Sequence, residues 1–186
     1  VSVGTELTTG QTVDTNSAWL SRQLAAIGWG VSTHVTVGDD QPAIEAAIRE
    51  ALPRCDALLI SGGLGPTADD LTRQALAAVM QAPLELNELW ASQIEAFFRA
   101  RGRAMPATNR IQAMIPRGAT MIFNTCGTAA GIHAQLASGR ARPTDVFIMP
   151  GVPKEMFAMF ARDGLPALRD RGNGAVILSR TLHTFG

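Results

Sequence analysis

The sequence predicts an α/β fold with a mainly parallel sheet. Segments with the residue pattern of strands alternate along the chain with segments that have helical spacing. A glycine-rich stretch at residues 61–72 (SGGLGPTADDLT) joins the apolar run 57–60 to a helical pattern that starts at Leu71. The chain has 186 residues, of which 46% are hydrophobic, so it can build a substantial core. These observations favour helices packed in layers against a sheet.

The first half of the chain predicts three successive strands with helices between them. Residues 1–3 are expected to end a first strand, and 30–37 and 57–60 to form the second and third. Asp14, Thr15 or Asn16 can cap the helix after the first strand, and Gly28 can end it. The second helix is expected to start within residues 39–42.

The second half predicts helices first and then further strands. Asn87 opens a long helix that presents Trp90, Ile94, Phe97 and Phe98 and ends near Gly102. Residues 109–115 are expected to form a short helix, and Pro153 suits the first turn of a final helix. Strands are predicted at residues 119–123, 130–137, 145–149 and 175–184.

Composition excludes several classes of function. Lys plus Arg and Asp plus Glu number 16 each, so no basic excess points to nucleic acid. No apolar run reaches the length that spans a membrane. Cys55 and Cys126 lack the spacing of a disulfide framework or a zinc site, which favours a reducing, cytoplasmic location.

The glycine-rich turn is the strongest candidate for a binding site. A turn from a strand into a helix N-terminus presents backbone N–H groups and the positive end of a helix dipole, both of which favour an anion. The candidate ligand-binding residues here are Gly62, Gly63, Gly65, Pro66 and Thr67. The glycines could instead serve only a tight connection. The spacing matches neither a P-loop nor a dinucleotide-binding fingerprint, but ligands in open α/β sheets bind beyond the carboxyl ends of strands.

Two aspartates are candidate catalytic residues and metal ligands. Asp70 fits the capping-box pattern that starts at Thr67, and it could equally bind Mg²⁺ or orient water. One of Asp39 and Asp40 could only cap a helix. If the second and third strands are neighbours, Asp39 and Asp70 flank one cleft, where two carboxylates beside a phosphate could share a metal or activate water.

Other polar segments follow predicted strands and are weaker candidates, because surface loops are often polar as well. The segment after the first strand could contact a small polar ligand, and the junction at 150–155 could bind an anion or merely end a strand. Our remaining candidate ligand-binding residues are Thr5, Glu6, Gly10, Asp14, Asn16, Asn109, Thr128, Pro150, Gly151, Pro153, Lys154 and Glu155. The histidines lack metal-ligand spacing, and the aromatic residues at helical spacing favour core or oligomer contacts.

Six sequence blocks, in this order, resemble the N-terminal region of CinA-family proteins. They are GTEL at 4–7, GQ with VDTN at 10–16, VGDD at 37–40, GGLGPT with DDLT at 62–72, NR with QA at 109–113, and PGVPKEM at 150–156. The resemblance covers almost the whole chain. It implies the molybdopterin-binding fold of the MoaB and Mog proteins, a three-layer α/β/α sandwich, over residues 1–172. Residues 173–186 resemble the start of a segment that links to a C-terminal region.

The resemblance also implies an activity. In the CinA group this domain is associated with metal-dependent hydrolysis of ADP-ribose to AMP and ribose 5-phosphate. In the Mog group it binds molybdopterin and transfers an adenylyl group, with paired aspartates that align with Asp39 and Asp70. The expected cations are Mg²⁺ or Co²⁺, with K⁺ as a further one. The expected partners are a small nucleotide or molybdopterin and other copies of the chain, with no nucleic acid or membrane.

We therefore predict a metal-dependent pyrophosphohydrolase of ADP-ribose or a related dinucleotide. The alternative is a molybdopterin- or nucleotide-binding module without turnover, either like proteins of molybdenum cofactor biosynthesis or as a regulator of a nicotinamide mononucleotide deamidase domain. A third possibility is an oligomerisation scaffold built on the helix that carries Trp90 and Phe98. The sequence lacks the C-terminal deamidase domain common in the family. It also has Ala68 in place of a frequent proline and Thr8–Thr9 in place of a more apolar pair.

Overall fold

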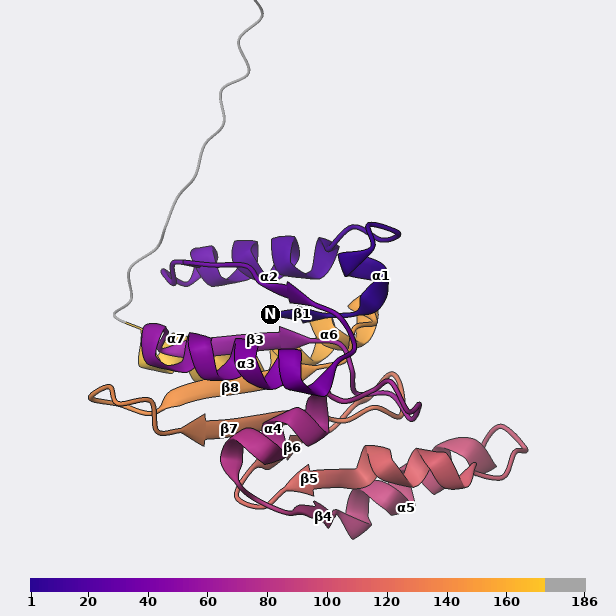
Figure 1. Ribbon diagram of the computed structural model, residues 1–186. Helices are drawn as coiled ribbons and strands as arrows, with labels where there is room; N and C mark the ends of the chain where they lie inside the picture. Colours follow the sequence, from indigo (N-terminus) through magenta and orange to yellow (C-terminus); the bar gives the residue numbers. More distant parts are fainter. Residues whose placement is uncertain (173–186) are drawn as a thin grey trace, which may run out of the picture.

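The computed structural model, which describes residues 1–172, has a six-stranded sheet with helices on both faces (Figure 1). The strand order is β2-β1-β3-β8-β7-β6. Strands β2, β1, β3 and β8 run parallel, and β7 and β6 are antiparallel to their neighbours. The mainly parallel α/β sheet is thus confirmed. The strands span Ser2–Val3 (β1), Thr36–Val37 (β2), Ala57–Ser61 (β3), Thr120–Ile122 (β6), Gly131–Leu136 (β7) and Thr144–Met149 (β8).

Two hydrophobic clusters form the layers on either side of the sheet. On one face, Ile44 and Ile48 of α3 (Gln41–Ala51) and Leu76 of α4 (Thr72–Met80) pack on alternate residues of β3 and β8. On the other face, α2 (Thr15–Ala26), α6 (Pro153–Met159) and α7 (Leu165–Arg171) pack around Phe147 and Met149. Every residue of β8 is buried, as expected for a central strand covered on both faces.

A small lobe extends from the sheet beyond α4 (Figure 1). It contains α5 (Glu88–Arg99) and the antiparallel pair β4 (Leu84–Leu86) and β5 (Met114–Pro116), and Trp90 and Ile94 are buried in its core. The sequence patterns missed β4 and β5, because three-residue strands are too short to show a period. The aromatic residues of α5 only partly form a core, since Trp90 is buried while Phe97 and Phe98 are half-buried.

Helix caps agree closely with the sequence patterns. Asp14, Asp40 and Asn87 each accept a hydrogen bond from the backbone N–H three residues later, at 2.9 Å, and so begin α2, α3 and α5. Gly28 follows α2 with a positive φ of 81°. These local signals need only a few neighbouring residues, so sequence alone is sufficient to place them.

Five expectations need correction. The second strand comprises only Thr36–Val37, and residues 30–35 adopt no regular structure. The polar segment after β1 contains a one-turn helix, α1 (Thr5–Thr8). The short helix is a 3₁₀ helix at Ala107–Ala113, and α4 starts at Thr72, so both aspartates of the glycine-rich stretch precede it. The final helix continues from α6 through a π-helical turn at Phe160–Gly164 into α7. The strand predicted at 175–184 lies outside the described residues.

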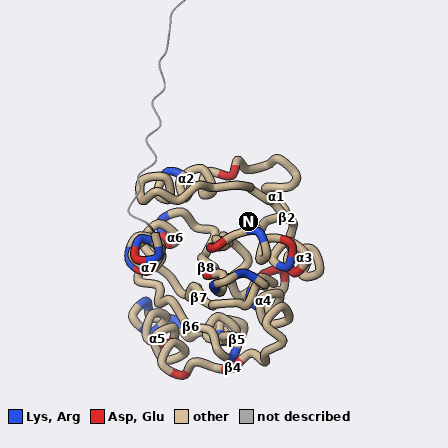
Figure 2. The backbone as a smooth tube through the Cα atoms, turned by 90° about the vertical axis from the view of Figure 1, so that its left-hand side faces the viewer, with Lys and Arg blue, Asp and Glu red and all other residues tan. Residues whose placement is uncertain are grey.

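Charged residues of both signs are mixed along the chain (Figure 2). Helix α3 carries Glu45, Arg49 and Glu50, and α7 carries Arg169, Asp170 and Arg171. Among residues 1–172, no helix combines the length and apolar character needed to cross a bilayer.

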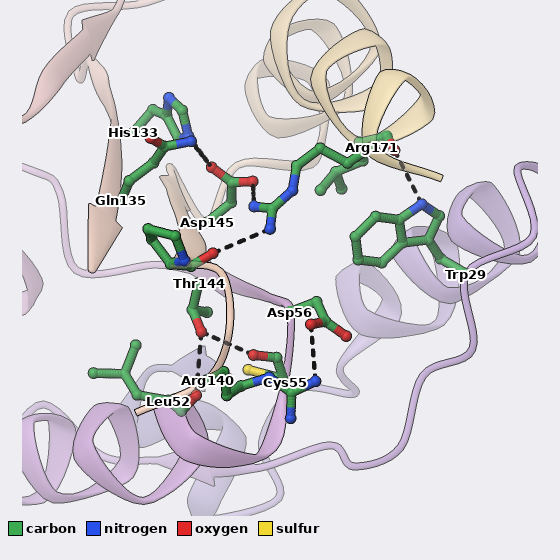
Figure 3. Close-up of polar contacts among 12 residues, drawn as sticks. Trp29, Leu52, Cys55, Asp56, His133, Gln135, Arg140, Thr144, Asp145 and Arg171 are labelled. Atoms are coloured by element: carbon green, nitrogen blue, oxygen red, sulfur yellow. Dashed lines mark hydrogen bonds and ion pairs between the residues drawn. The ribbon is translucent and has the colours of Figure 1, made fainter. Parts of the chain in front are cut away.

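A buried carboxylate attaches α7 to the sheet (Figure 3). Asp145, at the start of β8, is 1% exposed and accepts hydrogen bonds from His133 (2.9 Å), Gln135 (3.0 Å) and Arg171 of α7. Burial raises the pKa of the Asp145 carboxyl, but the hydrogen bonds from Arg171, His133 and Gln135 outweigh burial, so its pKa lies below the usual range.

Replacing Asp145 with asparagine is expected to lower the free energy of unfolding at pH 7 by about 1–3 kcal/mol, because Arg171 and His133 lose a charged acceptor. A carboxyl with a lowered folded-state pKa contributes stability above its unfolded pKa of about 4 and loses that contribution as pH falls through the folded pKa. The difference between wild type and D145N should therefore shrink below about pH 4. Urea titrations between pH 7 and 3 measure this difference in the free energy of unfolding.

The matched control is D56N. Exposed Asp56 pairs with Arg140 at 2.8 Å (Figure 3), so D56N should change the free energy of unfolding by less than about 1 kcal/mol. An equal effect of D56N would contradict a special role for Asp145.

Candidate functional site

A cleft of about 470 Å³ opens at the carboxyl ends of β1, β3 and β8. The arrowheads of β1 and β3 in Figure 1 point toward this edge of the sheet, where α1 also lies. The cleft is lined by the segments that follow these strands, together with Asp39 after β2 and residues from the small lobe. Lining residues are Val3, Gly4, Glu6, Asp39, Gly62, Gly63, Leu64, Gly65, Thr67, Asp69, Asp70, Gln112, Thr128, Ala129, Pro150, Gly151, Val152 and Glu155.

The glycine loop, residues 62–65, needs its glycines for shape. Gly62 and Gly63 have positive φ angles of 107° and 66°. A Cβ atom on Gly62 would lie 2.1 Å from the Val3 carbonyl oxygen, and one on Gly63 would lie 2.0 Å from the Thr72 hydroxyl. That hydroxyl donates to the Gly62 carbonyl at 2.9 Å. The loop is therefore pressed between β1 and the start of α4, and no side chain fits there.

Two backbone donors of this loop are available to a ligand. The Gly62 N–H donates to the Met149 carbonyl at 3.0 Å, and the Gly65 N–H donates to Asp70 at 2.8 Å. Within the described residues, the N–H groups of Gly63 and Leu64 have no acceptor. Successive free N–H groups in a left-handed turn at a helix N-terminus suit an anion.

Asp70 lies inside the turn that leads from the glycine loop to α4. One of its carboxylate oxygens accepts from the Gly65 N–H, and the other accepts from the Thr67 N–H at 2.9 Å and from the Thr67 hydroxyl. The carboxylate thus reaches back three residues, as the capping-box pattern predicts, although it caps the turn rather than the helix itself. The oxygen that accepts from Gly65 keeps a free lone pair, whereas the other oxygen already has two donors, and the metal-ligand role predicted for Asp70 stays a prediction.

Asp39 and Asp40 have different partners. Asp40 caps α3, whereas one Asp39 oxygen accepts from the Thr5 N–H at 2.8 Å, and the Asp39 N–H donates to the Thr5 hydroxyl at 3.2 Å. This reciprocal pair ties α1 to the end of β2 and places the Asp39 carboxylate on the cleft wall. Asp39 and Asp70 both line the cleft, but the second and third strands are not neighbours as that expectation required, because β1 lies between β2 and β3.

Side-chain hydrogen bonds hold the surrounding segments together. Asn16 donates to the Ser61 hydroxyl (2.9 Å) and to the Gly151 carbonyl (2.8 Å), so it joins α2 to the turns after β3 and β8. On the far wall, Asn124 donates to Glu155 at 2.6 Å, which fixes the turn before β7 against α6. These contacts give the cleft its shape without any ligand.

The predicted site residues fall into two groups. Those that line the cleft are Glu6, Asp39, Gly62, Gly63, Gly65, Thr67, Asp70, Thr128, Pro150, Gly151 and Glu155. The others, outside the lining, are Thr5, Gly10, Asp14, Asn16, Pro66, Asn109, Pro153 and Lys154. Several of the second group support the site indirectly: Thr5 holds Asp39, Asn16 bridges two turns, and Asn109 donates to Gln112 at 2.8 Å. Another cavity, of about 270 Å³ at the amino ends of β1 and β3, is lined by none of them.

The ionisable side chains that line the cleft are all acidic. Glu6, Asp39, Asp69, Asp70 and Glu155 are lining residues, and no Lys, Arg or His is among them. Carboxylate oxygens are the ligands that Mg²⁺ prefers, so the donor chemistry fits a divalent cation. In the described part of the chain no three such side chains are grouped closely enough to hold a metal by themselves. A cation would therefore have to share one or two carboxylates with oxygens of the ligand, as Mg²⁺ usually does beside phosphates.

Sequence reasoning missed three contributors to this site. Gln112 and Asp69 line the cleft, and both belong to the quoted blocks, but neither was selected as a site residue. Arg73 lies in the first turn of α4, 1% exposed, and donates to the Leu64 carbonyl of the glycine loop at 3.0 Å. A charge at one position of a helix normally indicates an exposed face, so helical periodicity gave no sign of this contact.

Comparison with known proteins finds relatives along almost the whole chain. A family model described as "Probable molybdopterin binding domain" matches residues 1–170. A CinA-like protein of Gemmatimonas aurantiaca is 44% identical over 99% of this chain, and a putative competence-damage inducible protein of Symbiobacterium thermophilum is 42% identical over 100% of it. The chain spans 43% of the length of each of these relatives.

Solved structures agree with these matches. The crystal structure of the protein CinA from Thermoplasma acidophilum superposes with a TM-score of 0.77 at 35% identity, over 87% of this chain and 91% of that one. The tungsten cofactor synthesizing protein MoaB from Pyrococcus furiosus superposes with a TM-score of 0.58 at 17% identity, over 91% and 92% of the two chains, which establishes the shared fold.

Proposed function

The chain belongs to the CinA family and has the molybdopterin-binding fold, and from that premise we propose that the cleft binds the phosphate group of a small nucleotide or pterin. The observation that carries the proposal is the glycine loop at the carboxyl ends of the parallel strands, with the free N–H groups of Gly63 and Leu64. Ligands of open α/β sheets bind at such an edge, and N–H groups at a helix N-terminus favour phosphate.

The size and walls of the cleft support a ligand larger than phosphate alone. A volume of about 470 Å³ lies within the usual range for small-molecule sites. Gln112 and Thr128 on the side of the small lobe offer an amide and a hydroxyl for hydrogen bonds to a heterocyclic ring. The molybdopterin of the family description and the adenine nucleotide of ADP-ribose both combine a phosphate with such a ring.

A second candidate function is hydrolysis of a pyrophosphate ligand such as ADP-ribose. The carboxylates around the glycine loop favour it, since a phosphate can approach them only with a cation between. Asp39 and Asp70 would hold this cation together with phosphate oxygens. A bound divalent cation would neutralise phosphate charge and lower the pKa of a water molecule. The second Asp39 oxygen, which has no partner among the described residues, would orient the water that attacks phosphorus, and the P–O–P bond would break to give AMP and ribose 5-phosphate.

One experiment tests both functions. The purified chain is titrated with AMP, ADP-ribose and molybdopterin by calorimetry, with and without Mg²⁺ or Co²⁺, and the ADP-ribose samples are then analysed for AMP by chromatography. Binding of at least one ligand without AMP formation supports a binding module. AMP formation that requires the metal supports the hydrolase. A folded chain that binds none of the three ligands would refute the proposal.

The neighbouring aspartates supply a matched pair of variants. Asp39→Asn should reduce AMP formation at least a hundredfold, while AMP itself binds within a few-fold of wild type, because the carboxylate would act on metal and water. Asp40→Asn should change neither quantity, since asparagine caps helices as well as aspartate and Asp40 lies outside the cleft lining. Equal rates in wild type and D39N would remove Asp39 from the proposed reaction.

A further inference from the structure

Arg73 is a buried cation directly behind the glycine loop. It is the bulkiest fully buried side chain of the described residues, at 1% exposure. Its Nη2 donates to the Leu64 carbonyl at 3.0 Å, while Nη1 is buried without a hydrogen-bond partner among residues 1–172. Burial lowers the pKa of Arg73 to about 10, with Asp70 opposing that shift, so the guanidinium keeps its charge at neutral pH.

Burying this guanidinium is costly, and no carboxylate within the described residues forms an ion pair with it. A buried charge without a counter-charge normally destabilises a fold. The nearest acidic influence is Asp70, whose two oxygens are engaged by Gly65 and Thr67. Among residues 1–172, Arg73 is therefore a positive charge without an ion-pair partner.

The contact with Leu64 links this charge to the cleft. Leu64 is a residue of the glycine loop and lines the cleft, and its carbonyl also faces the Gln112 amide at 3.5 Å. Holding this carbonyl fixes the peptide group that joins Leu64 to Gly65 and so helps to keep the loop backbone in its left-handed shape. The N–H groups of Gly63 and Leu64 then stay free to donate.

Electrostatics explains why a cation is needed at this place. The lining carries five carboxylates and no basic side chain, so an anion that enters meets repulsion. A charge buried in the low-dielectric interior acts on the loop with little screening by water. The dipole of α4 adds to the same potential, because Arg73 lies in the first turn of that helix.

We propose that Arg73 is a positioning residue and the buried counter-charge for the ligand's phosphates, so that the cleft selects ligands by their number of negative charges. This inference rests on the proposed phosphate-binding function. It adds that nucleoside diphosphates, and phosphate esters with more than one phosphoryl group, bind more tightly than monophosphates, and that the neutral nucleoside gains nothing from Arg73.

A ligand series separates this charge effect from a merely structural one. Affinities for adenosine, AMP and ADP are measured by calorimetry at low ionic strength for wild type, Arg73→Met and Arg73→Lys, after circular dichroism has established that each is folded. Arg73→Met should lower the affinity for ADP at least tenfold and the affinity for AMP by a smaller factor. The affinity for adenosine should stay within twofold of wild type. Arg73→Lys keeps the charge and should restore most of the ADP affinity. Added salt should reduce the difference between wild type and R73M.

Other outcomes would overturn the inference. An equal loss for all three ligands in R73M would make Arg73 purely structural, and an unchanged ADP affinity would remove it from binding. If wild type binds none of the ligands, the proposed function fails together with the inference, whereas binding by wild type without a charge-graded loss refutes the inference alone. If R73M does not fold, the inference is tested by comparing the ligand affinities of R73K and wild type and by observing the amide resonances of Gly63 and Leu64. Those resonances should shift when inorganic phosphate is added to wild type, and no shift would contradict the model.

Discussion

Replacing Gly62 with alanine is expected to lower the free energy of unfolding by about 3–5 kcal/mol, one of the two largest effects that the structure predicts. Alanine at this position would have to adopt a φ of 107°, and its Cβ would lie 2.1 Å from the Val3 carbonyl oxygen, which belongs to the backbone of β1 and cannot rotate away. Either the loop must move away from β1 or its backbone must change shape, so ligand binding should be lost as well. Urea denaturation and calorimetry with ADP measure the two losses.

Gly10 provides the matched control. It also has a positive φ, of 74°, but a Cβ atom there would have no atom within 4 Å. Gly10→Ala therefore pays only the backbone strain, expected at about 1 kcal/mol, and leaves the cleft intact. If G62A and G10A destabilise the protein equally, the close packing of the glycine loop on β1 is not what requires Gly62.

Replacing Asp70 with asparagine is expected to weaken binding of ADP or ADP-ribose at least tenfold and to lower the free energy of unfolding by about 1–2 kcal/mol. An amide has one acceptor oxygen, so it cannot accept from Gly65 on one side and from Thr67 on the other. One of the two N–H groups then faces an NH₂ group, and the turn between the glycine loop and α4 loosens. Binding and urea denaturation are measured on the same samples.

Asp69 separates the two roles considered for Asp70. It is exposed, lines the cleft, and has no hydrogen-bond partner among the described residues. Asp69→Asn should leave stability unchanged, since it removes charge without breaking the turn. A loss of metal-dependent binding in D69N but not in D70N would show that Asp70 serves only the turn. Unchanged stability in D70N would contradict the turn-holding role.

The parts of the fold that the sequence predicted are those governed by local chemistry. The caps Asp14, Asp40 and Asn87 depend on a side chain and an N–H three residues away, and the central strands β3 and β8 show as apolar runs. The strand predicted at 30–37 was too long, because the alternating residue pattern at 30–35 belongs to exposed residues that precede the two-residue strand β2. The strands β4 and β5 exist because they pair with each other, a contact between residues about 30 apart that no local pattern records.

The candidate site divides in the same way. The glycine spacing, and the rule that ligands bind beyond the carboxyl ends of parallel strands, located the cleft. Asp39 and Asp70 both reach it, although β1 separates the two strands that the sequence argument required to be neighbours. Only the hydrogen bonds in the structure distinguish Asp40, which caps a helix, from Asp39, which does not, since adjacent aspartates look alike in a sequence. The small-lobe residue Gln112 entered the lining only because β4 and β5 carry that segment back to the sheet.

By itself, the sequence determined the family, the mainly parallel α/β layers and the position of the glycine loop, because repeated apolar patterns, caps and glycines act over a few residues. The tertiary structure alone decided which polar groups are buried and what they contact. Arg73 is the clearest case: a charged residue in a helix predicts exposure, and only the packing of α4 beneath the glycine loop turns it into a buried donor to Leu64. Burial depends on contacts distant in the chain, and these arise only when the sheet and its helices assemble.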